Sequence, residues 1–155
     1  MKKLIFLFAM SLCMTQGINA QNITIKDGLY YNGNVLYSGN YTALDANGKT
    51  KASYTIADGK ANGAVVYYYE NGAVMETGAF VNNEKSGEWL RWDENGHKTG
   101  QAFYVMGKKN GTWLVWDMNG VKRYEMNYAM GEKTGTWKMW DENGVLTSEK
   151  NYSTI

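Results

Sequence analysis

A period of 24 residues is the feature that most constrains the fold of this chain. The pattern Gly-x-Trp-x-x-Trp-Asp-x-Asn-Gly occurs at 87–96, 111–120 and 135–144, so its starts lie 24 residues apart. The same interval reaches back to segments 63–72 and 39–48, which keep the final Asn-Gly but not the tryptophans. A fixed period of this length is typical of repeat proteins, in which neighbouring units bury a core only when they stack.

Each 24-residue unit predicts one β-hairpin. Asp-x-Asn-Gly suits a type I turn closed by a glycine with positive φ, and the flanking runs are rich in aromatic and β-branched residues. A second glycine-containing segment, Gly-x-Lys-x-Gly in two of its copies, is expected to form the turn that joins one hairpin to the next. A helix through Trp-x-x-Trp is excluded because the glycines that bracket each pair leave too few residues for a stable helix.

The fold class that follows is all-β. We predict an elongated antiparallel β-meander of about five 24-residue hairpin repeats over residues 39–155. Residues 21–38 contain Leu-Tyr-Tyr-Asn-Gly, which resembles the end of a hairpin strand, but the spacing to the next unit is irregular. We therefore expect this segment to be a degenerate N-terminal cap or repeat.

All six tryptophans fall on two positions of the repeat. Because residues three apart in a strand face opposite sides, each pair must divide between the two faces of the sheet. Equivalent residues of successive hairpins lie two strands apart, about 9.6 Å. Recurring aromatic residues, such as Tyr104 and Tyr128, can fill that gap and predict a ladder of stacked rings. One face would carry Trp89, Trp113 and Trp137, and the other Trp92, Trp116 and Trp140, with Tyr68 in phase with the second row.

The first 20 residues predict a secretory signal peptide. Two lysines precede an apolar run, Leu4 to Met14, and Ala20 offers a small residue at a cleavage site. The run is too short to span a bilayer as a helix, so no stable membrane insertion is expected. A lipoprotein signal with Cys13 as the modified residue is the alternative, disfavoured by the bulky Leu12 before it. Either signal predicts an exported protein, periplasmic or extracellular.

The composition offers little chemistry. The chain has one His and one Cys, which exclude a zinc site of several such ligands and a catalytic set with a second histidine. The formal net charge of +1 makes nucleic acid a poor candidate partner. The Asp-x-Asn-Gly turns resemble the opening of a calcium loop but lack its distal glutamate. We expect no catalytic residue, no metal site and no cofactor.

The repeat resembles the MORN-repeat variant family, which includes the YwqK-like proteins described as antitoxins. The resemblance rests on Gly-x-Trp-x-x-Trp-Asp-x-Asn-Gly and the lysine-containing turn, and covers about 39–155. The copy at 63–72 departs from it, with Val65, Tyr68 and Tyr69 at the two Trp and the Asp positions. The resemblance implies a hairpin-repeat sheet and a protein-interaction role, but it does not imply a toxin partner.

Two functions remain open from the sequence. The first is a non-enzymatic module that binds or scaffolds an unknown protein, and the alternative is a cell-wall or polysaccharide-binding module. In both, a row of partly exposed aromatics would be the binding platform, rimmed by Lys85, Lys108, Lys109 and Lys133. The competing interpretation is that both rows serve packing only. The candidate platform residues are Trp89, Trp92, Trp113, Trp116, Trp137, Trp140 and Tyr68.

Overall fold

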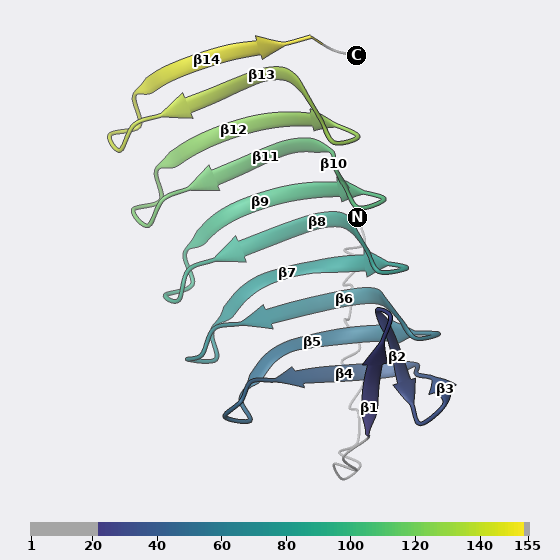
Figure 1. Ribbon diagram of the computed structural model, residues 1–155. Helices are drawn as coiled ribbons and strands as arrows, with labels where there is room; N and C mark the ends of the chain where they lie inside the picture. Colours follow the sequence, from purple (N-terminus) through teal and green to yellow (C-terminus); the bar gives the residue numbers. More distant parts are fainter. Residues whose placement is uncertain (1–21, 154–155) are drawn as a thin grey trace, which may run out of the picture.

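The computed structural model describes residues 22–153, and within them the regular structure is entirely β (Figure 1). The strands are β1 (Ile23–Lys26), β2 (Leu29–Asn32), β3 (Val35–Leu36), β4 (Gly39–Leu44), β5 (Thr50–Ala57), β6 (Lys60–Tyr68), β7 (Val74–Val81), β8 (Glu84–Trp92), β9 (Lys98–Val105), β10 (Lys108–Lys109), β11 (Gly111–Trp116), β12 (Lys122–Ala129), β13 (Glu132–Trp140) and β14 (Leu146–Tyr152).

Strands β4 to β14 form one antiparallel sheet in the order of the chain. The short strand β10 directly precedes β11, and both pair with β9. Figure 1 shows the hairpins laid side by side in a single curved layer. The predicted all-β meander of 24-residue hairpins is therefore confirmed.

Strands β1, β2 and β3 form a separate three-stranded sheet, which we call the cap, at the N-terminal end of the meander. The cap is tied to the first inter-hairpin turn, because the Tyr30 backbone N–H donates to Gly59 O and the Gly59 N–H donates to Tyr37 O. Tyr37 is buried with Ile56 and Ala61, and the Tyr30 ring packs beside this small core. The cap thus covers one face of the meander over its first hairpins.

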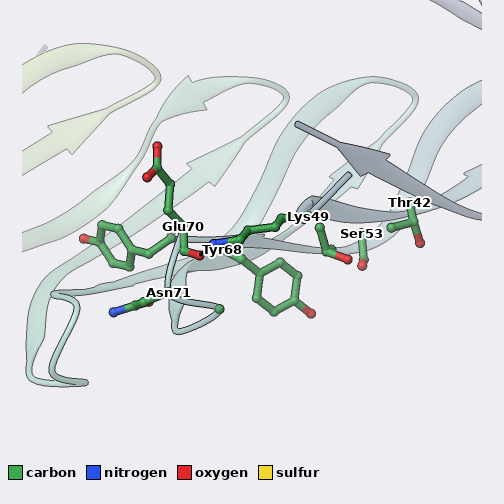
Figure 2. A pocket seen from close by; sticks show the side chains of 9 residues that line it. Thr42, Lys49, Ser53, Tyr68, Glu70 and Asn71 are labelled. Carbon is green, nitrogen blue, oxygen red and sulfur yellow. Dashed lines mark hydrogen bonds between the residues drawn. The ribbon is translucent and has the colours of Figure 1, made fainter. Parts of the chain in front are cut away.

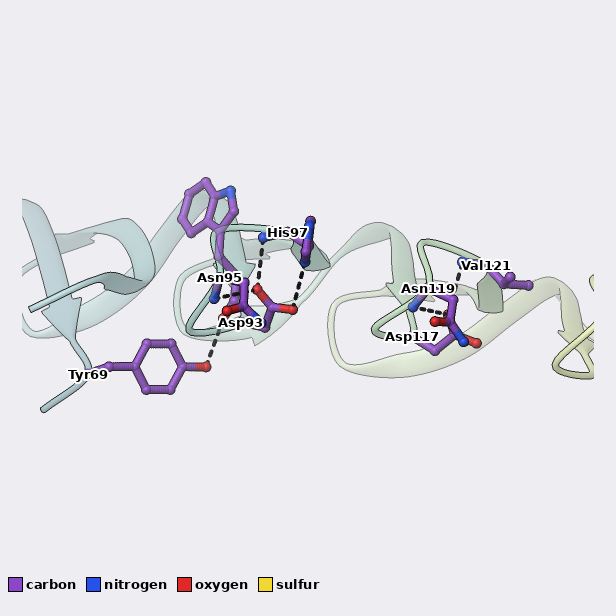
Figure 3. A network of polar contacts seen from close by, with 8 residues as sticks. Tyr69, Asp93, Asn95, His97, Asp117, Asn119 and Val121 are labelled. Carbon is purple, nitrogen blue, oxygen red and sulfur yellow. Dashed lines mark hydrogen bonds and ion pairs between the residues drawn. The ribbon is translucent and has the colours of Figure 1, made fainter. Parts of the chain in front are cut away.

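The Asp-x-Asn-Gly turns have the predicted geometry. The Gly96 N–H donates to Asp93 O at 3.1 Å, and Asp93 Oδ1 accepts the backbone N–H groups of Asn95 and His97, both at 2.9 Å (Figure 3). Gly96 has φ 84°, which a glycine adopts without strain. The same contacts recur at Asp45, Asp117 and Asp141.

The turns between hairpins occupy only the first two residues of the predicted turn segments, such as 106–107 within 106–111. They are two-residue turns with positive φ at both positions, such as Met106–Gly107 (φ 47° and 71°) and Met130–Gly131 (49° and 99°). This is the geometry that joins twisted antiparallel strands most tightly. The lysine that follows already belongs to the next strand, and the second glycine, such as Gly111, has positive φ at a strand irregularity rather than at a turn.

The predicted signal peptide, residues 1–20, and the alternative acceptor Cys13 lie outside the described residues. Among residues 22–153, no helix has the length and apolar character needed to cross a membrane.

Candidate binding surface

The rings of Trp89, Trp113 and Trp137 lie on one side of the meander, which we call the ladder face. Tyrosines of the intervening strands separate them, with ring-centroid distances from 5.0 Å for Trp137–Tyr152 to 6.1 Å for Trp89–Tyr104. The ladder predicted from the 24-residue period is confirmed as a packing arrangement. It continues toward the N-terminus through tyrosines, and the cap residue Tyr30 ends it, 5.0 Å from Tyr41.

Trp89 differs from its two equivalents. It is only 2% exposed, and its indole packs directly onto Gly78, at a position that holds Ala102 and Met126 in the next units. The indole N–H groups of Trp113 and Trp137 donate to the carbonyl oxygens of Phe103 and Asn127, at 3.1 and 2.9 Å. Trp89 Nε1 is buried without a partner among the described residues. Trp89 is therefore a core residue and not an accessible platform.

A lysine four residues upstream covers each ladder tryptophan. The distances from Nζ to the ring centroid are 3.6 Å for Lys85–Trp89, 4.4 Å for Lys109–Trp113 and 4.4 Å for Lys133–Trp137. Each of these ammonium groups also lies within 5.3 Å of the next tyrosine ring. Such cation–π contacts contribute about 0.5–1 kcal/mol each where the lysine is exposed. The ladder thus presents ammonium groups over its rings instead of open indole faces.

Trp92, Trp116 and Trp140 lie on the opposite face, as the strand alternation predicted, and all three are half-buried. Lys98 Nζ lies 4.5 Å from the Trp116 ring, and Lys122 Nζ lies 4.2 Å from the Trp140 ring. For Trp92 the equivalent residue, 24 positions before Lys98, is Val74, so this tryptophan has no lysine at the corresponding position. This second row is therefore also partly covered by side chains of the neighbouring hairpin.

Tyr68 lies at the turn end of the N-terminal hairpins and not beside the ladder. With Thr42, Ser53 and Lys49 it lines an open hollow of about 650 Å³, whose rim includes Glu70 (Figure 2). Lys49 Nζ donates to the Glu70 carbonyl oxygen at 3.1 Å. Tyr67 belongs to the ladder, so strand alternation places Tyr68 on the opposite face, that of Trp92, Trp116 and Trp140, as its phase predicted.

A second hollow, of about 520 Å³, lies beside Trp89, Tyr104 and Trp113. Its lining includes Gly100 and Ala102, which are small, whereas the next unit has Tyr124 and Met126 at the equivalent positions. Arg91 and Glu76, which lie opposite each other in the register of β8 and β7, also line this hollow.

An apolar patch lies further along the same face. Val115 pairs with Tyr124, and Tyr124 pairs with Met139, so the three side chains are neighbours across β11, β12 and β13. Tyr124 is 41% exposed and Met139 is 39% exposed. These residues and Arg91 were not predicted from the sequence, although each lies two residues after a ladder tryptophan or pairs with a residue that does. The two-residue alternation of strands was the signal that could have found them.

Charge is divided unequally between the two faces of β8–β14. Lys85, Lys109, Lys133 and Lys150 lie over ladder rings, and Lys85 is paired with Glu76 at 3.5 Å. Strand alternation places the carboxylates of β8–β14 on the opposite face, where Glu125 pairs with Lys122 at 2.7 Å and Glu149 approaches Lys138 at 3.9 Å. The ladder face of this half of the meander is therefore basic, and the opposite face is close to neutral.

The described residues offer no group of three or more His, Cys, Asp or Glu side chains that could hold a metal ion. His97 Nδ1 lies 3.1 Å from Asp93 Oδ2 at an exposed turn (Figure 3). The backbone N–H of His97, its ring and the N–H of Asn95 lower the pKa of Asp93. Burial opposes the same effect at Asp117, but the N–H groups of Val121 and Asn119 together with Arg123 outweigh it and lower the pKa of that carboxyl. These carboxylates are turn-forming groups.

Three segments of the chain, residues 61–82, 85–106 and 133–153, match the MORN repeat variant. Repeats of this kind generally act as protein- or membrane-interaction modules and are generally non-catalytic. No curated protein matches the chain. Among solved structures, the chain is similar to part of a crystal structure of the GtfA/B complex bound to UDP and GlcNAc, with 10% identity and a TM-score of 0.30. That similarity covers 89% of this chain but only 25% of the other, and it is too weak to support an argument.

Proposed function

We propose that this chain is an exported, non-enzymatic interaction module that binds a protein partner on its ladder face. The observation that carries the proposal is the cap. A segment of the chain itself, β1–β3, already lies against the first hairpins and adds Tyr30 to the end of the aromatic ladder. The same ladder continues to Tyr152, and β1–β3 cover only its N-terminal part.

The patch of Val115, Tyr124 and Met139 supports a macromolecular partner on this surface. Tyr124 and Met139 are exposed and Val115 beside them is half-buried, and a contiguous exposed apolar group marks an interaction site more often than scattered single residues do. The polysaccharide alternative has weaker support, because the ladder indoles are covered by lysines and two of them use their N–H groups for backbone carbonyls. A sugar-binding platform needs an accessible ring face.

Site-specific photo-crosslinking tests this proposal. A photoreactive phenylalanine analogue at position 124 reports on the ladder face, and the same analogue at the exposed position 88 reports on the opposite face. We expect a protein to be cross-linked in the source cells from position 124 and not from position 88. Capture of glycan alone, or equal capture from both positions, would contradict the proposal.

The export part of the proposal has its own test. The basic start and apolar run of the first 20 residues support processing by a signal peptidase. We expect the mature protein, recovered from the envelope or the medium, to begin at Gln21. A mature protein that retains Met1, recovered only from the cytoplasm, would contradict export while leaving the binding surface untouched.

A further inference from the structure

We propose that the ladder face of β8–β14 recognises an acidic polypeptide segment in an extended, polyproline-II-like conformation, with carboxylates at every third residue. This inference rests on the proposed function, because it names the chemistry of the partner that the ladder face would bind. Three features carry it: the sign of the charge, the spacing of the lysines and the position of the apolar patch.

The ladder face carries several cationic side chains that have no acidic partner, and they determine the sign of the charge that the ligand must have. Among the described residues, Lys109, Lys133 and Lys150 of the ladder face lie over aromatic rings and make no ion pair. Arg91 is exposed and lines the hollow of about 520 Å³ beside Trp89; its cross-strand neighbour there is Glu76, but Arg91 makes no ion pair among the described residues. Four cations on one face, with the strand carboxylates of β8–β14 on the other, favour an anionic ligand.

The spacing of the lysines selects the conformation of that ligand. Lys109 and Lys133, which make no ion pair among the described residues, and Lys85, which pairs with Glu76, recur every 24 residues, or two strands. Their positions therefore lie about 9.6 Å apart in the direction across the strands. A polyproline II helix has three residues per turn and rises about 3.1 Å per residue, so it repeats a side chain on one side every 9.3 Å or so. A β-strand repeats a side chain on one face about every 6.7 Å and would not stay in step with the lysines.

The apolar patch offers a contact surface for the prolines of the proposed ligand. Tyr124 and Met139 flank the lysine row on the same face, and extended proline-rich segments are commonly held by exposed aromatic surfaces. A polypeptide is favoured over an acidic polysaccharide because the surface is continuous with one that a polypeptide, the cap, already occupies. A second copy of the chain is disfavoured because Tyr30 already fills the N-terminal end of the ladder.

Binding of synthetic peptides to the purified protein tests the inference. The probe has four Pro-Pro-Glu triplets and one tyrosine, and the control peptide has the same composition with its glutamates clustered at one end. At low salt we expect the triplet peptide to bind at least about fivefold more tightly than the control. The double variant K109Q/K133Q should lose about tenfold in affinity, since two charge pairs at the surface together contribute on the order of 1.4 kcal/mol.

Matched variants separate a ladder-face effect from a change in net charge. The double variant K122Q/K138Q removes two cations from the opposite face and should keep the affinity of the unmodified protein. The variant K109R/K133R keeps both charges on the ladder face and should bind within about twofold of it. Thermal unfolding of all three variants shows whether a loss of binding reflects a loss of folding.

Several results would overturn the inference. Equal affinity for the triplet and clustered peptides would mean that only net charge is recognised. Binding solely to a polyuronate, solely to vesicles of anionic lipid, or only to a second copy of the chain would assign the surface to another ligand. If position 124 still cross-links a protein while the triplet peptide does not bind, the proposed function stands and this inference alone fails.

Discussion

The indole of Trp89 packs directly against the backbone of Gly78 on the neighbouring strand, where a Cβ atom would overlap Cδ2 and Cε2 of the ring. Trp89 is the most buried tryptophan of the ladder, and its indole N–H has no partner among the described residues. It depends on a glycine at a position that the next units fill with alanine or methionine.

Substitution of Gly78 by alanine should therefore disturb the ladder. Overpacking of this kind costs about 1–3 kcal/mol of unfolding free energy. The matched control is G100A, because a Cβ there would meet only Arg91 Cβ, at 3.3 Å. Urea unfolding should show a clear decrease in stability for G78A and a smaller one for G100A. Equal effects would mean that Trp89 is not held against Gly78.

Replacing a ladder tryptophan by alanine should lower the free energy of unfolding more when that tryptophan is more deeply buried. W89A should cost about 3–5 kcal/mol of unfolding free energy, the range for large buried aromatic residues. W137A should cost less, because Trp137 is half-buried and lies nearer the end of the ladder. Chemical unfolding followed by circular dichroism measures both values. A larger loss for W137A would contradict the assignment of the core to Trp89.

Two methionines have a positive φ, a backbone conformation that glycine and asparagine adopt more easily. Met106 and Met130 have φ 47° and 49° at the first position of their turns, and Met106 is 66% exposed. A non-glycine residue in this region costs roughly 1–2 kcal/mol, and asparagine tolerates it better. M106N should therefore raise the free energy of unfolding by several tenths of a kcal/mol or more, whereas M118N, at an exposed position without positive φ, should change it little. If M106N is less stable than the unmodified protein, the packing of the Met106 side chain contributes more to stability than its backbone strain costs.

Acid should weaken the hairpin turns. The pKa values of Asp93 and Asp117 are lower in the folded protein than the ordinary value of 3.8. Carboxylates with lowered folded pKa values contribute stability that is fully present above the unfolded pKa and is lost as the pH falls through the folded pKa. The urea midpoint should therefore fall below about pH 4, and the double variant D93N/D117N should have a flatter profile in that range. An identical pH profile for the variant would contradict this role.

The regular part of the molecule could be predicted from the sequence because each unit repeats the same local chemistry. The spacing of Trp113, Tyr104 and Tyr128 was enough to predict their stacking, since strand spacing and side-chain alternation are fixed by backbone geometry. The turns at Asp93 and Asp117 could be predicted because a type I turn favours Asp at its first position and glycine where φ is positive.

The rest depended on tertiary contacts or on exceptions to local preference. The turn segments predicted between the hairpins contain Met106 and Met130, but the sequence did not single out these two residues, because methionine is a poor residue for positive φ. The docking of Tyr30 beside Tyr41 could not be predicted, because the irregular spacing before Gly39 gives no register. The separation of charge between the two faces could have been predicted from strand alternation, but the predicted platform was defined by the six tryptophans and Tyr68. Whether those tryptophans bind a ligand stays a prediction.

The indole N–H resonances of the six tryptophans, recorded by NMR during titration with the triplet peptide, test the ladder face as a binding surface most directly. We predict that the signals of Trp113 and Trp137 shift in proportion to peptide bound, while those of Trp92, Trp116 and Trp140 stay in place. Shifts confined to the second row, or binding that moves none of the ladder signals, would contradict the account.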